Sequence, residues 1–260
     1  MIAPKASGHA PVNGINMYYE IYGEGGMPLV LIHGGGSTIG TSFGNLLPWL
    51  DKNRMIIAME LQAHGRTTDR DAPESFEQDA KDVVGLLAHL GVHKADFLGF
   101  SNGGTTTLHI AAHHPETVNK IVVVSANYQR EGMIAGFFEG MRHATLHDMP
   151  QVLQDAFLKL TPDKDSLQTM FEKDKARMLN FEDMRDEDLQ SIKAQTLLIV
   201  GDKDVMTCEH VLKMSHLIPH ARLTILPGTH GSFIGEEGTL VQGSRMIEAT
   251  TILIEEFLRG

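Results

Sequence analysis

The sequence predicts an α/β fold built on a mostly parallel, doubly wound sheet of about eight strands. Short runs such as Pro28–Ile32 and Ile121–Ser125 are apolar on both faces, as strands inside a parallel sheet are, and amphipathic helical stretches alternate with them. The chain begins with a hairpin pattern, and residues 128–194 carry no strand signal. We therefore expect a core of residues 1–127 and 195–260, with residues 128–194 inserted after the sixth strand as a helical cap.

The elements of the core can be placed in order from the amino terminus. Ala10–Ile15 followed by Asn16–Tyr22 predicts a hairpin, because Asn13-Gly14 supplies the two left-handed positions of a type I′ turn. The remaining strands are expected at Pro28–Ile32, Arg54–Met59, Ala95–Gly99, Ile121–Ser125, Thr196–Val200 and Leu223–Leu226. Helices are expected at Phe43–Leu50, Glu74–Leu90, Asn102 to Pro115, His210–Leu217 and Leu240–Leu258, and a polar loop at Glu60–Asp71.

The cap is expected to contain three or four helices. Their predicted bounds are Glu131–His147, Pro150–Leu160, Asp165–Leu179 and Asp186–Ile192. The first carries an apolar stripe formed by Met133, Ile134, Phe137, Phe138 and Met141. We expect part of this stripe to pack in the core and the rest to line a pocket that the cap closes.

Composition excludes several classes of partner. The 260-residue chain has a formal net charge of −11 and no run of lysines or arginines, which argues against binding to nucleic acid or to an anionic membrane. No stretch approaches the roughly 20 apolar residues of a membrane span. The one cysteine, Cys208, suits a reducing compartment, so a cytoplasmic location is expected. A removed signal peptide would leave no trace, and the sequence leaves both export and the choice between monomer and homodimer open.

The stretch around Ser101 carries the strongest functional signal. Gly99-Phe100-Ser101-Asn102-Gly103 is a G-x-S-x-G motif between an apolar strand and a helix, the context of a nucleophile elbow. A serine at so tight a turn is strained, and its neighbours two residues away come too close for a Cβ atom. The helix that begins at Asn102 would direct free backbone N–H groups at the same point.

A serine nucleophile needs a histidine base and a carboxylate that orients the base. The chain supplies both after later strands. Gly201-Asp202-Lys203-Asp204 follows the strand TLLIV, and Gly228-Thr229-His230-Gly231 follows the strand LTIL. Sequence separation alone leaves Asp202 and Asp204 as competing candidates for the acid.

With these motifs the sequence resembles the α/β-hydrolase superfamily, specifically its small capped members with esterase, lactonase and carbon–carbon hydrolase activities. The resemblance rests on LIHGGG, GFSNGG, LLIVGDKD and LPGTHG, and covers nearly the whole chain outside the cap. It implies a triad of Ser101, Asp204 and His230, because Asp204 holds the fourth position of the G-x-x-D turn. Asp202 would then stabilise the turn through its own backbone.

The resemblance also implies an oxyanion hole made by the backbone N–H groups of Gly35 and Asn102. No cofactor is implied and no metal is expected. His109 and His113 stand four residues apart on a helix, but no third ligand is evident, so they are expected to be surface residues. His64 and His33 are expected to hold their loops by hydrogen bonds. Pocket residues are expected near the carboxyl end of the sheet: Phe100, Tyr128, Met133, Phe137, Met206 and Phe233.

These features predict a serine hydrolase that cleaves a small, largely apolar carboxylic ester through an acyl-enzyme. Serine at the elbow argues against dehalogenase and epoxide-hydrolase chemistry, which the resemblance associates with a carboxylate at that place. Three alternatives stay open from the sequence: a lactonase, a carbon–carbon bond hydrolase, and a slow-turnover ligand receptor that retains the triad.

Overall fold

The protein forms an eight-stranded sheet in the order β1-β2-β4-β3-β5-β6-β7-β8, in a computed structural model that describes residues 2–50 and 53–260. The strands are β1 (Ala6–Val12), β2 (Ile15–Tyr22), β3 (Leu29–Ile32), β4 (Ile56–Met59), β5 (Ala95–Phe100), β6 (Val118–Val124), β7 (Gln195–Gly201) and β8 (Ala221–Leu226). The strands from β3 onward pair in parallel, and the amino-terminal hairpin β1-β2 joins β4 antiparallel. The predicted fold class is confirmed.

The hairpin turn forms as its sequence predicts. Asn13 and Gly14 have φ values of 44° and 88°, and Val12 pairs with Ile15 across the turn. Both left-handed positions of the turn are therefore occupied by residues that tolerate them.

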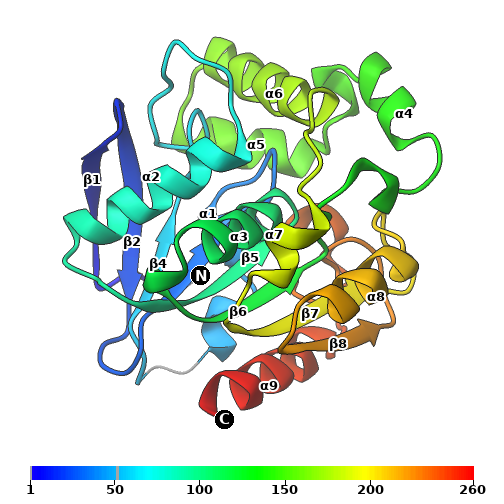
Figure 1. The fold of residues 1–260 in the computed structure, drawn as a ribbon. Coiled ribbons are helices and arrows are strands. Elements are labelled where there is room, and N and C mark those ends of the chain that lie inside the picture. The colour runs from blue at the N-terminus through cyan, green and yellow to red at the C-terminus, as the bar shows by residue number, and fades with distance from the viewer. Residues whose placement is uncertain (1, 51–52) are drawn as a thin grey trace.

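Helices cover both faces of the sheet (Figure 1). They are α1 (Ile39–Phe43), α2 (Phe76–His89), α3 (Asn102–His113), α4 (Phe137–His143), α5 (Gln151–Leu160), α6 (Lys164–Leu179), α7 (Asp186–Gln190), α8 (Cys208–Leu217) and α9 (Met246–Arg259). Alternate strand residues divide the core into two layers. Val30 and Ile32 face the layer that contains α2, α3 and α8, whereas Leu29 and Leu31 face the layer of α1 and α9. Burial on both faces explains why the strand sequences are continuously apolar.

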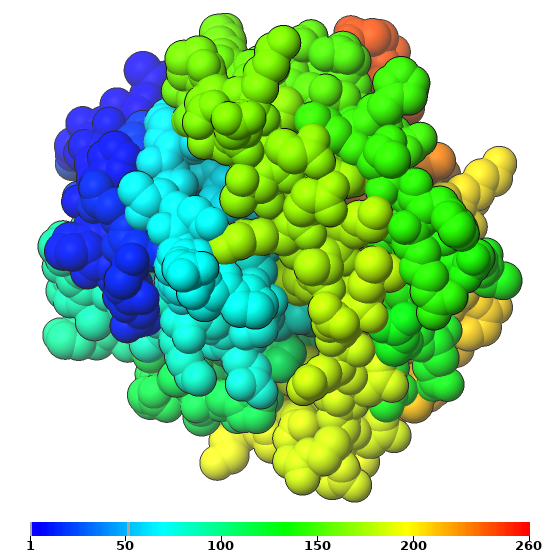
Figure 2. Space-filling model, turned by 90° about the horizontal axis from the view of Figure 1, so that it is seen from above, coloured from blue at the N-terminus to red at the C-terminus, as the bar shows by residue number. Residues whose placement is uncertain are grey.

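The segment between β6 and β7 contains α4, α5, α6 and α7, and no strand of the sheet lies in it. Helices α5 and α6 share a small apolar cluster that includes Phe157 and Met170. Seen from above, this segment (green to yellow-green) covers much of the upper face of the molecule (Figure 2). In contrast, α7 packs against α3 and α8 of the core. None of the helices in the described ranges is long and apolar enough to cross a membrane.

Three helices differ from their predicted bounds, and each difference has a local cause. The helix expected at Phe43–Leu50 is wrong: α1 begins at Ile39, where the Thr38 side chain caps it, and ends at Phe43, and Leu47–Trp49 forms only a 3₁₀ turn. The first cap helix begins at Phe137, not at Glu131, because Gly136 adopts a left-handed conformation with φ 83°. The closing helix begins at Met246, not at Leu240, and Gly243 is also left-handed, with φ 73°.

Candidate active site

Ser101 stands at the junction of β5 and α3 in a strained backbone conformation, with φ 54° and ψ −122°. The turn is so tight that a Cβ atom at Gly99 would lie 2.1 Å from the Gly103 carbonyl oxygen. A Cβ atom at Gly103 would lie 2.1 Å from the Ile32 carbonyl oxygen. Glycine at both places is therefore a steric requirement of the elbow, as the motif predicts.

His230 lies between Ser101 and Asp204 in space. Its Nε2 atom is 3.0 Å from Ser101 Oγ, and its Nδ1 atom is 2.8 Å from Asp204 Oδ1. Because an ionised carboxylate can only accept, Nδ1 carries the proton and Nε2 is left to accept the Ser101 hydroxyl proton. The Asp204 side chain is fully buried, and the His230 side chain is one-quarter exposed. This is the geometry by which a histidine base can activate a serine.

Asp204 is surrounded by hydrogen-bond donors. Its Oδ1 accepts from His230 and, at 2.7 Å, from the Val205 N–H; its Oδ2 accepts from Ser125 Oγ at 2.5 Å. Burial alone would raise the pKa of Asp204, but the hydrogen bond and charge of His230 and the Ser125 hydroxyl outweigh burial and lower it. Ser125, with a left-handed φ of 51°, contacts this carboxylate, and no motif in the sequence predicts that contact.

Asp202 occupies a different position from Asp204. Its Oδ1 accepts the Gly228 N–H at 2.8 Å, so it joins the loop after β7 to the loop that carries His230. The expectation that Asp202 stabilises its own turn is wrong, because its carboxylate accepts a hydrogen bond from the neighbouring loop instead.

The loop after β3 places Gly35 and Gly36 beside the elbow. The Gly36 N–H donates to Asp174 Oδ2, whereas the Gly35 N–H has no acceptor within the described part of the chain. Asn102 is the first residue of α3, so its N–H has no intrahelical acceptor either. His33 holds this loop: its Nδ1 bonds the Gly34 carbonyl at 2.7 Å, and its Nε2 accepts the Leu61 N–H at 2.9 Å.

A cavity of about 350 Å³ opens onto Ser101 and His230. Of the predicted pocket residues, Met133, Phe137 and Met206 line it. Its wall is largely apolar and unusually rich in methionine, with Met133, Met141, Met149, Met170, Met178 and Met206. Flexible thioether side chains fill irregular space and adapt to different apolar partners. The hydrogen-bonded residues Ser101 and His230 therefore face an apolar space, and the segment between β6 and β7 supplies most of its wall.

Three predicted pocket residues lie elsewhere. Phe100 and Phe233 are fully buried in the core layer of α1 and α9, with the Phe100 ring centroid 4.8 Å from that of His230. Tyr128 is buried in the opposite layer, stacks on His210 and donates its hydroxyl to Asp186 at 2.8 Å. Phe100 and Phe233 are neighbours of the site in sequence, but their side chains fill the core layer of α1 and α9. From the predicted cap stripe, Ile134 is exposed and Phe138 stacks against Arg130.

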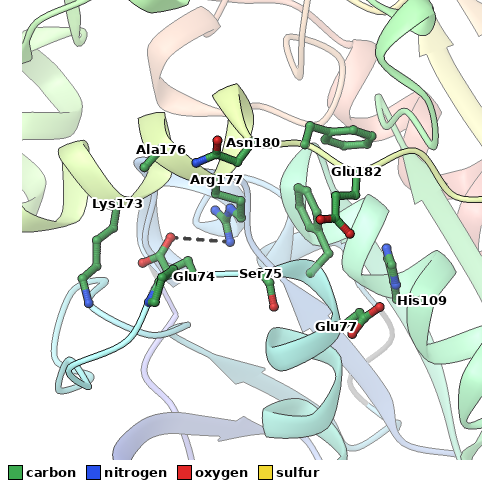
Figure 3. Close-up of a pocket in the computed structure, with 12 residues that line it drawn as sticks. Glu74, Ser75, Glu77, His109, Lys173, Ala176, Arg177, Asn180 and Glu182 are labelled. Atoms are coloured by element: carbon green, nitrogen blue, oxygen red, sulfur yellow. Dashed lines mark ion pairs between the residues drawn. The ribbon is translucent and has the colours of Figure 1, made fainter.

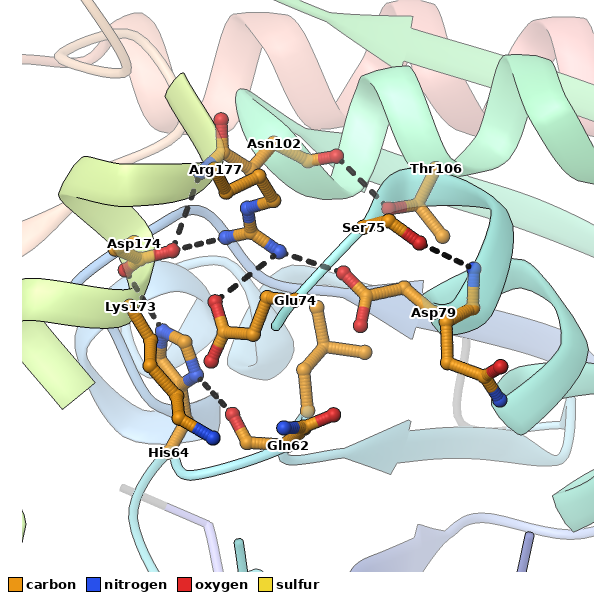
Figure 4. Close-up of polar contacts among 12 residues, drawn as sticks. Gln62, His64, Glu74, Ser75, Asp79, Asn102, Thr106, Lys173, Asp174 and Arg177 are labelled. Atoms are coloured by element: carbon orange, nitrogen blue, oxygen red, sulfur yellow. Dashed lines mark hydrogen bonds and ion pairs between the residues drawn. The ribbon is translucent and has the colours of Figure 1, made fainter. Parts of the chain in front are cut away.

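A buried cluster of charged side chains adjoins the cavity (Figure 4). Its centre is Asp174 on α6, which contacts His64 and Arg177; Arg177 pairs in turn with Asp79 and, at 3.7 Å, with Glu74. His64 holds its own loop through Gln62, as expected, but it also bonds α6. The one sequence signal for this cluster is the Asp-x-x-Arg spacing of residues 174 and 177 on a helix.

A second cavity, of about 280 Å³, is lined in part by Arg177 (Figure 3). Glu74, His109 and Lys173 line it, and neither Ser101 nor His230 does. His109 is buried, contrary to the expectation that it lies on the surface, and burial together with the charge of His113 lowers its pKa to about 4. Within the described ranges no group of three histidine, cysteine, aspartate or glutamate side chains is arranged to hold a metal ion.

Sequence and structure comparisons place this architecture among known proteins. A sequence model described as alpha/beta hydrolase fold matches residues 27–160, just over half of the chain. The human protein named Serine hydrolase BPHL is 36% identical over 140 residues, which cover 52% of this chain and 48% of that protein. The matched stretch thus spans about half the length of this relative. The chain belongs to the α/β-hydrolase fold family.

Solved structures agree with this assignment at the level of the fold. A meta-cleavage product hydrolase from Pseudomonas fluorescens superimposes with a TM-score of 0.79 and 20% identity, covering 98% of each chain. An enol-lactonase from Burkholderia xenovorans gives a TM-score of 0.75 and 20% identity, covering 97% of this chain and 100% of that one. Identities this low establish shared architecture alone.

Proposed function

We propose that this chain is a serine hydrolase that cleaves a carboxylic ester of a small, largely apolar substrate through an acyl-enzyme. The observation that supports this most directly is the continuous line of hydrogen bonds from Ser101 through His230 to Asp204, which opens onto an apolar cavity. The cavity volume of about 350 Å³ falls near the lower end of small-molecule sites, which range over roughly 300–1,000 Å³. A substrate of modest size fits that space.

In the proposed reaction, Ser101 Oγ attacks the acyl carbon as its proton passes to His230 Nε2. The carbonyl electron pair moves to the oxygen, which the N–H groups of Gly35 and Asn102 would stabilise. One such donor is typically worth about 3 kcal/mol in the transition state. His230 then gives its proton to the alcohol oxygen as the carbon–oxygen bond breaks. Water attacks the acyl-enzyme, its proton passes through His230 to Ser101, and the acid leaves.

The loop geometry favours Gly35 over Gly36 as the second donor. The Gly36 N–H is already bound to Asp174, while the Gly35 N–H is unengaged within the described residues. Residues 128–194 act, in this proposal, as a lid that excludes water from the acyl-enzyme, since they supply most of the cavity's apolar wall.

Turnover of p-nitrophenyl esters with acyl chains of two, four and eight carbons tests the proposal. We expect many turnovers per chain, one fluorophosphonate label per chain at Ser101, and loss of both in Ser101→Ala. Lactones and dienoates serve as the comparison substrates, because relatives of this fold include an enol-lactonase and a meta-cleavage product hydrolase. Labelling without turnover of any of the three substrate classes would indicate a receptor and refute the proposal.

A further inference from the structure

We propose that Asp174 is a positioning residue that fixes the oxyanion loop and the Asn102 side chain from the lid helix α6. This inference rests on the function proposed above and extends it, because it assigns part of the oxyanion site to the segment between β6 and β7. The residue does not touch Ser101 or His230; it acts on the groups that face the developing negative charge.

Asp174 contacts both the loop after β3 and the first residue of α3. Its position beside Asn102, His64 and Arg177 is seen in Figure 4. Its Oδ2 accepts the Gly36 N–H at 2.5 Å and His64 Nε2–H at 2.9 Å. Its Oδ1 accepts from Arg177 and, in a longer contact of 3.5 Å, from Asn102 Nδ2. The loop after β3, the first residue of α3 and the loop after β4 therefore meet at one carboxylate carried by α6.

Only an ionised carboxylate can accept all of these hydrogen bonds. Every group that faces the two oxygens is a donor, and each carboxylate oxygen has two lone pairs to offer. Burial by itself would raise the pKa of Asp174, but the Arg177 guanidinium and the His64 imidazolium outweigh burial and hold it below its ordinary range. An amide at this position would have to point its NH₂ group at a donor.

The loop is packed closely against this carboxylate. A Cβ atom at Gly35 would lie 2.4 Å from Asn102 Nδ2 and 3.1 Å from Asp174 Oδ2. Gly36 has a left-handed φ of 65°. Holding the Gly36 N–H in place fixes the peptide orientation on one side of Gly35, whose own N–H is the proposed oxyanion donor. A small rotation of the backbone at Gly35 would misalign the hydrogen bond from its N–H to the oxyanion, and the strength of that bond depends on its angle.

A carboxylate close to a developing oxyanion would ordinarily oppose catalysis. Here two cations lie beside it, one of which, Arg177, is shared with Asp79. Both ring nitrogens of His64 face acceptors, Gln62 O and Asp174 Oδ2, so the ring is protonated on both. Burial disfavours that charge, yet Asp174 raises the pKa of His64 to about 9. Arg177 supplies the second positive charge.

The test compares Asp174→Asn with the matched control Asp79→Asn. Asp79 accepts from Arg177 at 2.6 Å in the same buried cluster, but it has no contact with Gly36 or Asn102. We expect Asp174→Asn to lower kcat on a p-nitrophenyl ester about 10- to 100-fold, the loss typical of a weakened oxyanion donor, with KM changed less than about threefold. Asp79→Asn should lower thermal stability and leave kcat within about twofold.

Inhibition by an alkyl boronic acid distinguishes a positioning role of Asp174 from a purely structural one, which would leave the inhibition constant unchanged. Its tetrahedral adduct with Ser101 places an oxygen in the oxyanion site, so its inhibition constant should rise in Asp174→Asn by the same factor as kcat falls. The affinity of the carboxylic acid product should stay within about threefold. If Asp174→Asn does not fold, as judged by circular dichroism, Asp174→Glu replaces it: this variant keeps the charge, displaces the carboxylate and should show the same losses.

The outcomes separate the two proposals. Wild-type chain that hydrolyses esters, beside a folded Asp174 variant with unchanged kcat and boronate affinity, would overturn the positioning role alone. Equal kcat losses in Asp174→Asn and Asp79→Asn would also overturn it, because they would indicate general destabilisation of the cluster. A wild-type chain without turnover would remove the proposed function, and this inference with it.

Discussion

Replacing Asp204 by asparagine tests the acid assignment most directly, with Asp202→Asn as its matched control. Asp204 Oδ1 accepts His230 Nδ1–H, and the other contacts of its two oxygens are also donors: the Ser125 hydroxyl and the N–H groups of Gly201, Val205 and Met206. An asparagine NH₂ group would face a donor in either orientation. The side chain would lose a bond to His230 or leave a buried donor unpaired.

The expected loss follows from the tautomer of His230. If the NH₂ group faces Nδ1, the ring takes its proton on Nε2 and can no longer accept from Ser101. Comparable changes in serine triads lower kcat about 10⁴-fold, or about 5.5 kcal/mol of transition-state stabilisation. The unpaired buried group costs a further 1–3 kcal/mol, roughly, of folding stability.

The control follows from the different contact of Asp202. Its oxygen accepts one N–H, that of Gly228, and an asparagine oxygen can accept the same bond. We expect Asp202→Asn to keep kcat within about threefold. Initial rates on p-nitrophenyl acetate, measured with titrated active sites, give the comparison. The acid assignment fails if Asp202→Asn is the more damaging change, or if Asp204→Asn retains more than about one-tenth of wild-type kcat.

Three other changes have defined outcomes. Ser101→Ala should lower kcat about 10⁶-fold and abolish fluorophosphonate labelling, and a residual rate above about one-hundredth would point to another nucleophile. Gly103→Ala should reduce the free energy of unfolding in urea by more than about 2 kcal/mol, because its Cβ would lie 2.1 Å from the Ile32 carbonyl; an unchanged midpoint would contradict the steric argument. Asp174 raises the pKa of His64 to about 9 against the opposing effect of burial. The charged His64 side chain therefore contributes fully to the free energy of unfolding below about pH 6.5, and this contribution is lost as the pH rises toward 9. The free energy of unfolding of the wild type should therefore fall by up to about 3 kcal/mol over that range. The melting temperature of His64→Gln should depend less on pH.

Local patterns were sufficient to predict the fold. Continuous apolar runs such as Leu29–Ile32 are produced by burial on both faces, and Asn13-Gly14 encodes its turn directly. The elbow was readable for a similar reason, because the clash that Gly99 and Gly103 avoid arises within a few residues of chain. The positions of Ser101, Asp204 and His230 follow from strand order, since the carboxyl ends of parallel strands meet at one edge of the sheet.

The sequence-based predictions that were wrong or absent concern the direction of side chains and their contacts with distant parts of the chain. Phe100 precedes Ser101 in sequence, but successive strand residues point to opposite faces, and its ring packs in the layer of α1 and α9. Asp174 was missed because an Asp-x-x-Arg pair on a helix has the same sequence pattern as an ordinary exposed ion pair. What distinguishes it is the placement of α6 over the Gly35-Gly36 loop, and no local sequence pattern encodes that placement.

The contact between α6 and Gly36 bears on how this scaffold could be re-engineered. The segment between β6 and β7 is an attractive unit to exchange for that of a relative, because it leaves and re-enters the core at two neighbouring strands. In this chain, however, that segment carries the acceptor for a backbone N–H of the core. A chimera that receives a foreign segment without a carboxylate at the place of Asp174 would leave that N–H and His64 Nε2–H without their acceptor. Grafts that retain Asp174 and Arg177 should therefore tolerate wider variation in the rest of the transplanted helices.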